Sequence, residues 1–155
     1  SYRLFKTSGV LSSTVVDLSG DGRAIPDYSN GNPGILDVDI PVAAPAGSLI
    51  RTLTIRSMDI NHAFLRDLYI VARWNGVDVA VLWNRLGGSN GNDGGFDDDL
   101  TDIIGGRDIV FDDRDYPEFA GLPADGVFTL HIEDRGPSDE GSIDDLVIEV
   151  EYLVP

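Results

Sequence analysis

The densest group of side chains that could do chemistry lies between residues 93 and 115. Nine aspartates fall in this stretch, with only Arg107 and Arg114 to offset their charge. Carboxylates this close repel one another unless a cation lies among them. Ca²⁺ accepts about six to eight oxygen ligands in loose geometry, and neighbouring glycines allow backbone carbonyls to join them. We therefore predict a calcium site, with the candidate ligands Asp93, Asp97, Asp98, Asp99, Asp112 and Asp113.

The alternative for this stretch is a solvated acidic loop, which is the usual role of a run of like charges. Residues 87–116 are longer than an ordinary connection between strands, however, and such a long connection is either mobile or tied down. A bound ion would tie it down. Mg²⁺ fits less well than Ca²⁺ because it requires tighter octahedral geometry and keeps its waters.

Two shorter acidic clusters lie elsewhere. Asp17 and Asp21 open a segment like an EF-hand loop, but Tyr28 stands at the position that requires a bidentate Glu, so a polar turn is the better interpretation. Asp134 and Asp139 flank a Gly-Pro turn. They could meet around a cation, or they could form an acidic turn that needs no ion.

The sequence gives little support for catalysis. A Ser-His-Asp arrangement would require His62 or His131, the two histidines of the chain. No Gly-x-Ser-x-Gly elbow is present, and His131 is expected on the polar face of a strand. His62 lies near a strand end, where a hydrogen-bonded structural histidine is usual. The one other catalytic arrangement that such an acidic sequence could form is a pair of carboxylates acting as acid and base. We expect a domain that is not itself an enzyme.

Aromatic residues suggest a second possible function. Trp74, Trp83, Tyr69 and Tyr116 could form a platform for sugar rings in a carbohydrate- or surface-binding module. Aromatic residues on a hairpin more often pack in the core or pair across strands. Both interpretations stay open at the level of sequence.

Length and charge limit the partners. The chain of 155 residues is long enough for one domain with its own core, and we treat residues 1–155 as a single domain. Eleven basic residues face 27 acidic ones, a net charge of -16, so nucleic acids and anionic membranes are repelled. The chain has no cysteine for a disulfide or thiolate site. No stretch approaches the roughly 20 apolar residues of a membrane span, and a start at Ser1 without a leader predicts a processed product or an excised domain.

The elements that position these residues are expected to be strands. Period-two alternation recurs between turn residues, and no window of helical length carries an apolar stripe. Asn75-Gly76 supplies the two positive-φ positions of a type I′ turn, which predicts a hairpin. The main expected strands are residues 2–6, 14–18, 34–40, 49–60, 67–74, 77–83, 127–133 and 146–152.

Strands with one apolar and one polar face need two sheets to bury the apolar faces. Residues 127–133 show the pattern well, because Phe128, Leu130 and Ile132 alternate with polar positions. The sequence therefore predicts an all-β fold, a jelly-roll-like antiparallel β-sandwich of eight or nine short strands.

Several short segments, taken in order, resemble one known family. They are Ile-Pro-Asp at 25–27, a His followed by Asp-Leu within 59–68, Leu-Gly-Gly at 86–88, a Thr-Leu strand ending in Asp at 126–134, and Asp-Glu-Gly-Ser-Ile at 139–143. This order resembles the P domain of proprotein convertases and bacterial subtilisin-like proteases. The resemblance covers residues 25–150 and leaves 1–24 as an N-terminal strand or extension.

The resemblance implies a jelly-roll β-sandwich that often follows a subtilisin-like protease and aids its folding, stability or substrate handling. It also implies bound calcium, as in several bacterial relatives, and no catalytic residues. Asp67 matches the aspartate of the family's Asp-Leu strand, and Asp134 and Asp139 match its late turn, so these three join the predicted calcium ligands. We expect a secreted, extracellular, bacterial protein whose partners are calcium ions and an attached protease domain or other modules of a parent protein.

Overall fold

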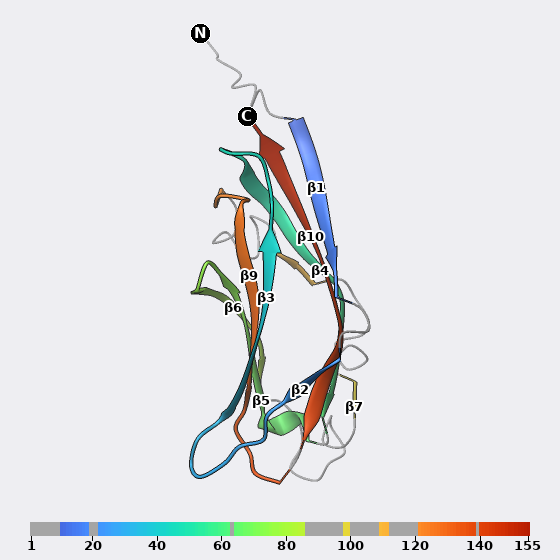
Figure 1. The fold of residues 1–155 in the computed structure, drawn as a ribbon, viewed down its shortest axis with the longest axis vertical. Coiled ribbons are helices and arrows are strands. Elements are labelled where there is room, and N and C mark those ends of the chain that lie inside the picture. The colour runs from blue at the N-terminus through green and yellow to red at the C-terminus, as the bar shows by residue number, and fades with distance from the viewer. Residues whose placement is uncertain are drawn as a thin grey trace.

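The fold is a sandwich of two antiparallel β-sheets (Figure 1). The computed structural model describes residues 10–18, 22–62, 64–85, 121–138 and 140–155, together with the backbone of 98–99 and 109–111. The one helical element in this described part is a single 3₁₀ turn, η1 (Leu65–Asp67). The all-β prediction is therefore confirmed, and the expected strand at 2–6 lies outside the described residues.

Within the described residues, the larger sheet has six strands and is built around the two longest of them. Strands β10 and β4 pair along almost their whole length, with β-bulges that let the long ribbon twist. Beside them, β1 and β2 pair with β10, and β7 and β8 pair with β4. Their bounds are β1 (Val10–Asp17), β2 (Arg23–Ile25), β4 (Leu49–His62), β7 (Asp98–Asp99), β8 (Ile109–Phe111) and β10 (Gly141–Val154).

The smaller sheet has four strands in the order β3-β9-β5-β6. From β2 to β5 and from β8 to β10, successive strands of the chain alternate between the two sheets, whereas β5 and β6 form a hairpin within the smaller sheet. Crossing between two antiparallel sheets in this way is typical of a jelly-roll-like sandwich, and the predicted fold class is confirmed. The bounds are β3 (Gly34–Val42), β5 (Leu68–Trp74), β6 (Val77–Asn84) and β9 (Gly126–Asp134).

The turn of the β5–β6 hairpin has the predicted conformation. Asn75 and Gly76 have φ values of 47° and 79°, as a type I′ turn requires. The Asn75 side chain also holds the turn to the neighbouring strand, because its Oδ1 accepts a hydrogen bond of 2.9 Å from the Val127 amide. Asn75 thus adopts the positive φ that the turn requires and also bonds the turn to β9.

The core lies between the two sheets and follows the period of the strands. On β9, Phe128, Leu130 and Ile132 are fully buried, and on β10 Ile148 and Val150 face them from the other sheet. Apolar burial on alternate positions is the main free-energy source that holds the sheets together. The segment that resembles an EF-hand loop is flanked by β1 and β2 where an EF-hand has helices.

Candidate functional site

Two of the predicted calcium ligands, Asp67 and Asp134, lie close together at one end of the sandwich. Asp134 is the last residue of β9, and Asp67 ends the 3₁₀ turn just before β5. The β5–β9 register places Leu68 opposite Asp134, so the neighbouring Asp67 is brought near it. Both aspartates are buried, and His62, the last residue of β4, contacts Asp134 from the larger sheet.

His62 and Asp134 form a buried ion pair that joins the two sheets. Nε2 of His62 lies 2.9 Å from Oδ2 of Asp134, and neither side chain has measurable exposure to solvent. The other imidazole nitrogen, Nδ1, is 3.0 Å from the Phe64 amide and 2.9 Å from the Phe64 carbonyl oxygen. Nδ1 therefore has an acceptor when protonated and a donor when neutral, so the ring keeps a partner in either state.

The second oxygen of Asp134 and the Asp67 backbone fix the turn after β9. Oδ1 of Asp134 accepts a hydrogen bond of 3.1 Å from the Gly136 amide, and the Arg135 amide donates to the Asp67 carbonyl oxygen at 2.8 Å. Gly136 lies so close to the Asp67 carboxylate that a Cβ at this position would collide with it. This turn thus requires glycine for space.

The environment of His62 raises its pKa above the ordinary value of 6.5. Burial by itself acts in the opposite direction, because it disfavours the charged imidazolium. The hydrogen bond to Asp134, the charge of Asp134, the Phe64 carbonyl and the charge of Asp67 together outweigh that effect. The folded protein therefore favours the protonated ring and, with it, a true ion pair.

These contacts bear on the predicted calcium ligands. Both carboxylate oxygens of Asp134 already accept hydrogen bonds from the protein, so fewer of its lone pairs are left for a calcium ion. In the described part of the chain, no group of three or more His, Cys, Asp or Glu side chains is arranged to hold a metal. Calcium coordination by Asp67 and Asp134 stays a prediction.

The backbone brings two more of the predicted ligands to the same end of the sandwich. In the β4–β7 register, Asp98 is opposite His62 and Asp99 is opposite Asn61. Asn61 donates hydrogen bonds to Asp59 and Asp144, at 3.2 Å and 3.0 Å. No local pattern connects Asn61 with Asp144, because the β4–β10 pairing brings the two together.

Asp98 and Asp99 are placed by the backbone of β7 alone. The other predicted ligands lie outside the described residues, and these are Asp93, Asp97, Asp112, Asp113 and Asp139.

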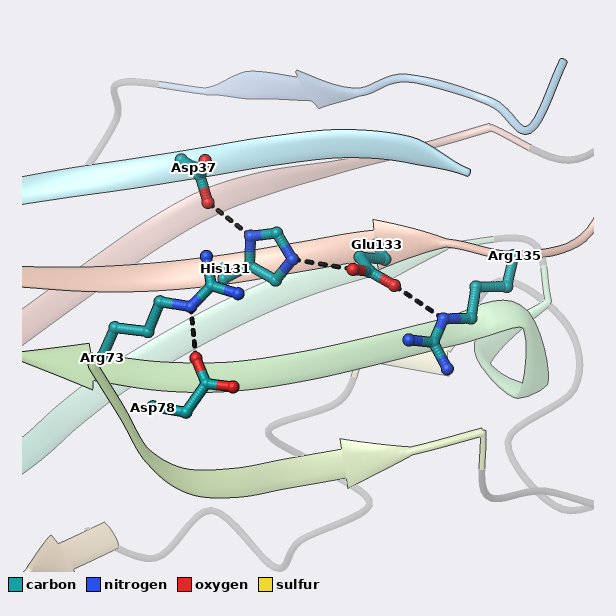
Figure 2. Close-up of polar contacts among 6 residues, drawn as sticks. All are labelled: Asp37, Arg73, Asp78, His131, Glu133 and Arg135. Atoms are coloured by element: carbon teal, nitrogen blue, oxygen red, sulfur yellow. Dashed lines mark hydrogen bonds and ion pairs between the residues drawn. The ribbon is translucent and has the colours of Figure 1, made fainter. Parts of the chain in front are cut away.

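A second polar network covers the outer face of the four-stranded sheet (Figure 2). His131 on β9 contacts Asp37 on β3 through Nδ1, at 2.5 Å, and Glu133 through Nε2, at 2.9 Å. Arg135 donates to Glu133 at 2.6 Å and stacks its guanidinium 3.9 Å from the centre of the Tyr69 ring. The network crosses three strands, so it links β3, β9 and β5 across the sheet.

The same contacts change the acidity of Glu133. Its partial burial tends to raise the pKa, but the hydrogen bonds and charges of His131 and Arg135 outweigh burial and lower it below 4.5. His131 was expected on the wet face of its strand. It does lie on the outer face, yet only 5% of it is exposed, because its neighbours on adjacent strands cover it.

The two histidines are thus committed to structural contacts. Every ring nitrogen of His62 and His131 faces a carboxylate or a backbone group. A histidine that serves as a general base needs one nitrogen facing the hydroxyl or water that it activates. The prediction that His62 is a hydrogen-bonded structural residue is confirmed.

The suggested sugar platform is wrong for its two tryptophans. Trp74 and Trp83 are 2% and 6% exposed, because both point from the β5–β6 hairpin into the core. Nε1 of Trp83 donates a hydrogen bond of 2.9 Å to the Leu65 carbonyl oxygen. A ring must present an open face to stack on a sugar, and neither indole does. Tyr116 lies outside the described residues.

No family model matches the chain, and no curated protein matches it at a significant level. Among solved structures, the chain is similar to the serine protease of Aeromonas sobria in a complex with a chaperone, with 16% identity and a TM-score of 0.52. That match covers 95% of this chain and 27% of the protease chain. A structure of the Aeromonas sobria serine protease itself gives 16% identity, a TM-score of 0.49, and coverage of 92% and 27%. The first match shows a shared fold, and the chain spans about a quarter of the protease chain with which it shares it.

Proposed function

We propose that this chain is a non-catalytic accessory domain of a secreted bacterial subtilisin-like serine protease, of the P-domain type, and that calcium stabilises it. The observation that carries the proposal is the fold match to part of a serine protease chain, which covers nearly all of this chain. The jelly-roll strand order and the ordered sequence segments agree with it. The role of the domain is then to support the folding, stability or substrate handling of the protease.

The arrangement of the histidines supports the non-catalytic part of the proposal. Both rings hold strands together and neither offers a free nitrogen to a nucleophile. No helix in the described part of the chain is long and apolar enough to cross a bilayer. In the parent protein, deletion of residues 10–155 is expected to reduce the yield of folded, active protease, whereas the isolated chain should not react with a fluorophosphonate probe for active serines.

The calcium part of the proposal is supported by the concentration of carboxylates and by the backbone register of β7. Asp98 and Asp99 adjoin a sheet end that already gathers Asp59 and Asp144 around Asn61. A hard cation close to this end would relieve the repulsion among such carboxylates. Because a ligand that binds only the folded state stabilises it, an excess of ~100-fold over Kd adds about 2.7 kcal/mol to the unfolding free energy.

The calcium test is a thermal unfolding series with Ca²⁺, with Mg²⁺ and with a chelator, followed by calorimetric titration. We expect a higher Tm with Ca²⁺ and little effect of Mg²⁺. The double substitution Asp98→Asn and Asp99→Asn should reduce the calcium effect, while Asp125→Asn, in an exposed turn, should leave it intact. An unchanged Tm with Ca²⁺ would rule out the calcium part, and the accessory role would still be tested by the deletion.

A further inference from the structure

Two Asn-Gly pairs in the described part of the chain lie in turns of the same type. Asn75-Gly76 closes the β5–β6 hairpin, and Asn30 and Gly31, with φ values of 52° and 83°, form a second type I′ turn. All four residues are exposed. In each pair a glycine amide follows an asparagine side-chain amide, and glycine has no Cβ that would hinder a reaction between them. The two pairs therefore share sequence, turn type and access to water.

The turn at Asn75 is held firmly. Asn75 exchanges two hydrogen bonds of 2.9 Å with Val127, one through its backbone amide and one through Oδ1. The side chain is also confined by Gly126, since a Cβ at that position would lie 2.7 Å from Asn75 Oδ1. Beyond the turn, the two strands of the hairpin pair along their length. Opening this turn would break its bonds to β9 and the first pairs of the hairpin.

The turn at Asn30 is held by a single bridge. Ser29 and Asn32 exchange two backbone hydrogen bonds, of 3.0 Å and 2.9 Å, and no strand continues this isolated pair. Among the residues that the structure describes, the Asn30 side chain has no hydrogen-bond partner. The base of the loop is fixed separately, because Gly34 lies so close to the Pro26 carbonyl that a Cβ would collide with it. The tip can therefore open without unfolding the sandwich.

Opening of the turn controls whether the two amides can react. In a type I′ turn the nitrogen of the second residue points away from the side chain of the first, so ring closure requires the asparagine to leave the left-handed conformation. We propose that Asn30 is a site of spontaneous deamidation and isoaspartate formation, whereas the same pair at Asn75 is protected. The difference comes from the free energy of opening each turn.

The reaction needs no group from outside the turn except water. The Gly31 nitrogen loses its proton and attacks Cγ of Asn30, the bond from Cγ to Nδ2 breaks, and ammonia leaves with that proton. The product is a cyclic imide. Water then opens the imide at either carbonyl, which gives isoaspartate or aspartate.

The modification changes the loop before β3 in two ways. Either product replaces a neutral amide by a carboxylate, which adds a negative charge to a chain whose net charge is already -16. Isoaspartate also lengthens the backbone by one carbon, so Ser29 and Asn32 can no longer pair in the same geometry. We expect the modified protein to lose this turn, while the strands of the core keep their pairing.

The test follows both reactions in the whole chain, incubated at mildly alkaline pH and analysed by peptide mass mapping. Trypsin places Asn30 and Asn75 in separate peptides, residues 24–51 and 74–85. The Asn-Gly pair at 90–91 lies outside the described residues and falls in a different peptide, residues 86–107. Methylation by protein isoaspartyl methyltransferase identifies isoaspartate. We expect Asn30 to react roughly tenfold faster than Asn75, because its turn opens more readily.

Two controls separate the effect of the fold from that of the local sequence. In the urea-unfolded chain both turns are lost, so the rates at Asn30 and Asn75 should become similar. Asn30→Gln should remove isoaspartate from the peptide of residues 24–51, because the longer side chain would have to close a six-membered ring. The rate at Asn75 should stay unchanged in this variant.

Three results would overturn the proposal. The first is an Asn75 rate equal to or above the Asn30 rate in the folded chain, including no reaction at Asn30 while the unfolded chain reacts. The second is a rate difference that persists in urea, which would assign it to the neighbouring residues. The third is isoaspartate in the peptide of residues 24–51 from the Asn30→Gln variant.

Discussion

Oδ2 of Asp134 and Nε2 of His62 lie 2.9 Å apart in the interior, and they join the end of β9 in one sheet to the end of β4 in the other. The pair is 72 residues apart in the sequence. It therefore joins the two sheets at this end of the sandwich, and its removal tests how strongly this end depends on one contact.

Substitution of Asp134 by alanine is expected to lower the unfolding free energy by about 3–5 kcal/mol, because it leaves a buried imidazolium without its partner. The exposed pair Arg56–Glu149, at 3.0 Å, is a matched control. Arg56→Gln should cost less than about 1 kcal/mol, since water screens that pair. Urea unfolding of both variants measures the difference, and equal losses would contradict a special role for the buried pair.

The stability of the protein should fall as the pH rises above 6.5, the ordinary pKa of His62, and through its raised folded pKa. The folded state raises the pKa of His62 above 6.5, so it holds the proton more tightly than the unfolded chain does. The stabilisation is fully present below pH 6.5 and is lost as the pH rises through the folded pKa. Denaturant unfolding at several pH values measures the slope, and His62→Gln should remove it. The same slope in the variant would show that another group causes it.

Gly136→Ala is expected to destabilise the fold by roughly 1–3 kcal/mol, because the added Cβ collides with the Asp67 carboxylate. Asp67→Ala in the same chain should recover part of this loss by opening the space. Gly22→Ala is a suitable comparison, since its Cβ would meet only Asp144 Oδ1, at 3.3 Å. If the loss of unfolding free energy in the double variant equals the sum of the losses in the two single variants, the added Cβ does not collide with the Asp67 carboxylate.

Asn75→Ala is expected to cost about 1–2 kcal/mol, because alanine tolerates the positive φ poorly and loses the bond to the Val127 amide. Asn84→Ala, at the exposed end of β6, should stay within about 0.5 kcal/mol. Thermal unfolding compares the two. If the Asn84 variant loses as much unfolding free energy as the Asn75 variant, the turn does not specifically require asparagine.

The sequence alone determined most of the long strands and one turn, because these depend on neighbouring residues, whereas the short strands β2, β7 and β8 were not predicted. Alternation of apolar and polar side chains located β9 and the late part of β10, and Asn75-Gly76 located the hairpin. It placed the start of β5 one residue too early, at Asp67, which belongs to the 3₁₀ turn. The excess of Asp over Lys and Arg leads to the prediction of cations as partners, which stays a prediction, and it does not show which carboxylates lie together.

Only the tertiary structure decided which residues meet. The sequence around Asp67 and Asp134 resembles that around other acidic turn residues. Strand pairing nevertheless buries both of them near His62. The same pairing turns Trp74 and Trp83 into the core, where alternation alone could not tell the inner face of the hairpin from the outer. Such contacts join positions far apart in the chain, and a local pattern carries no information about the partner strand.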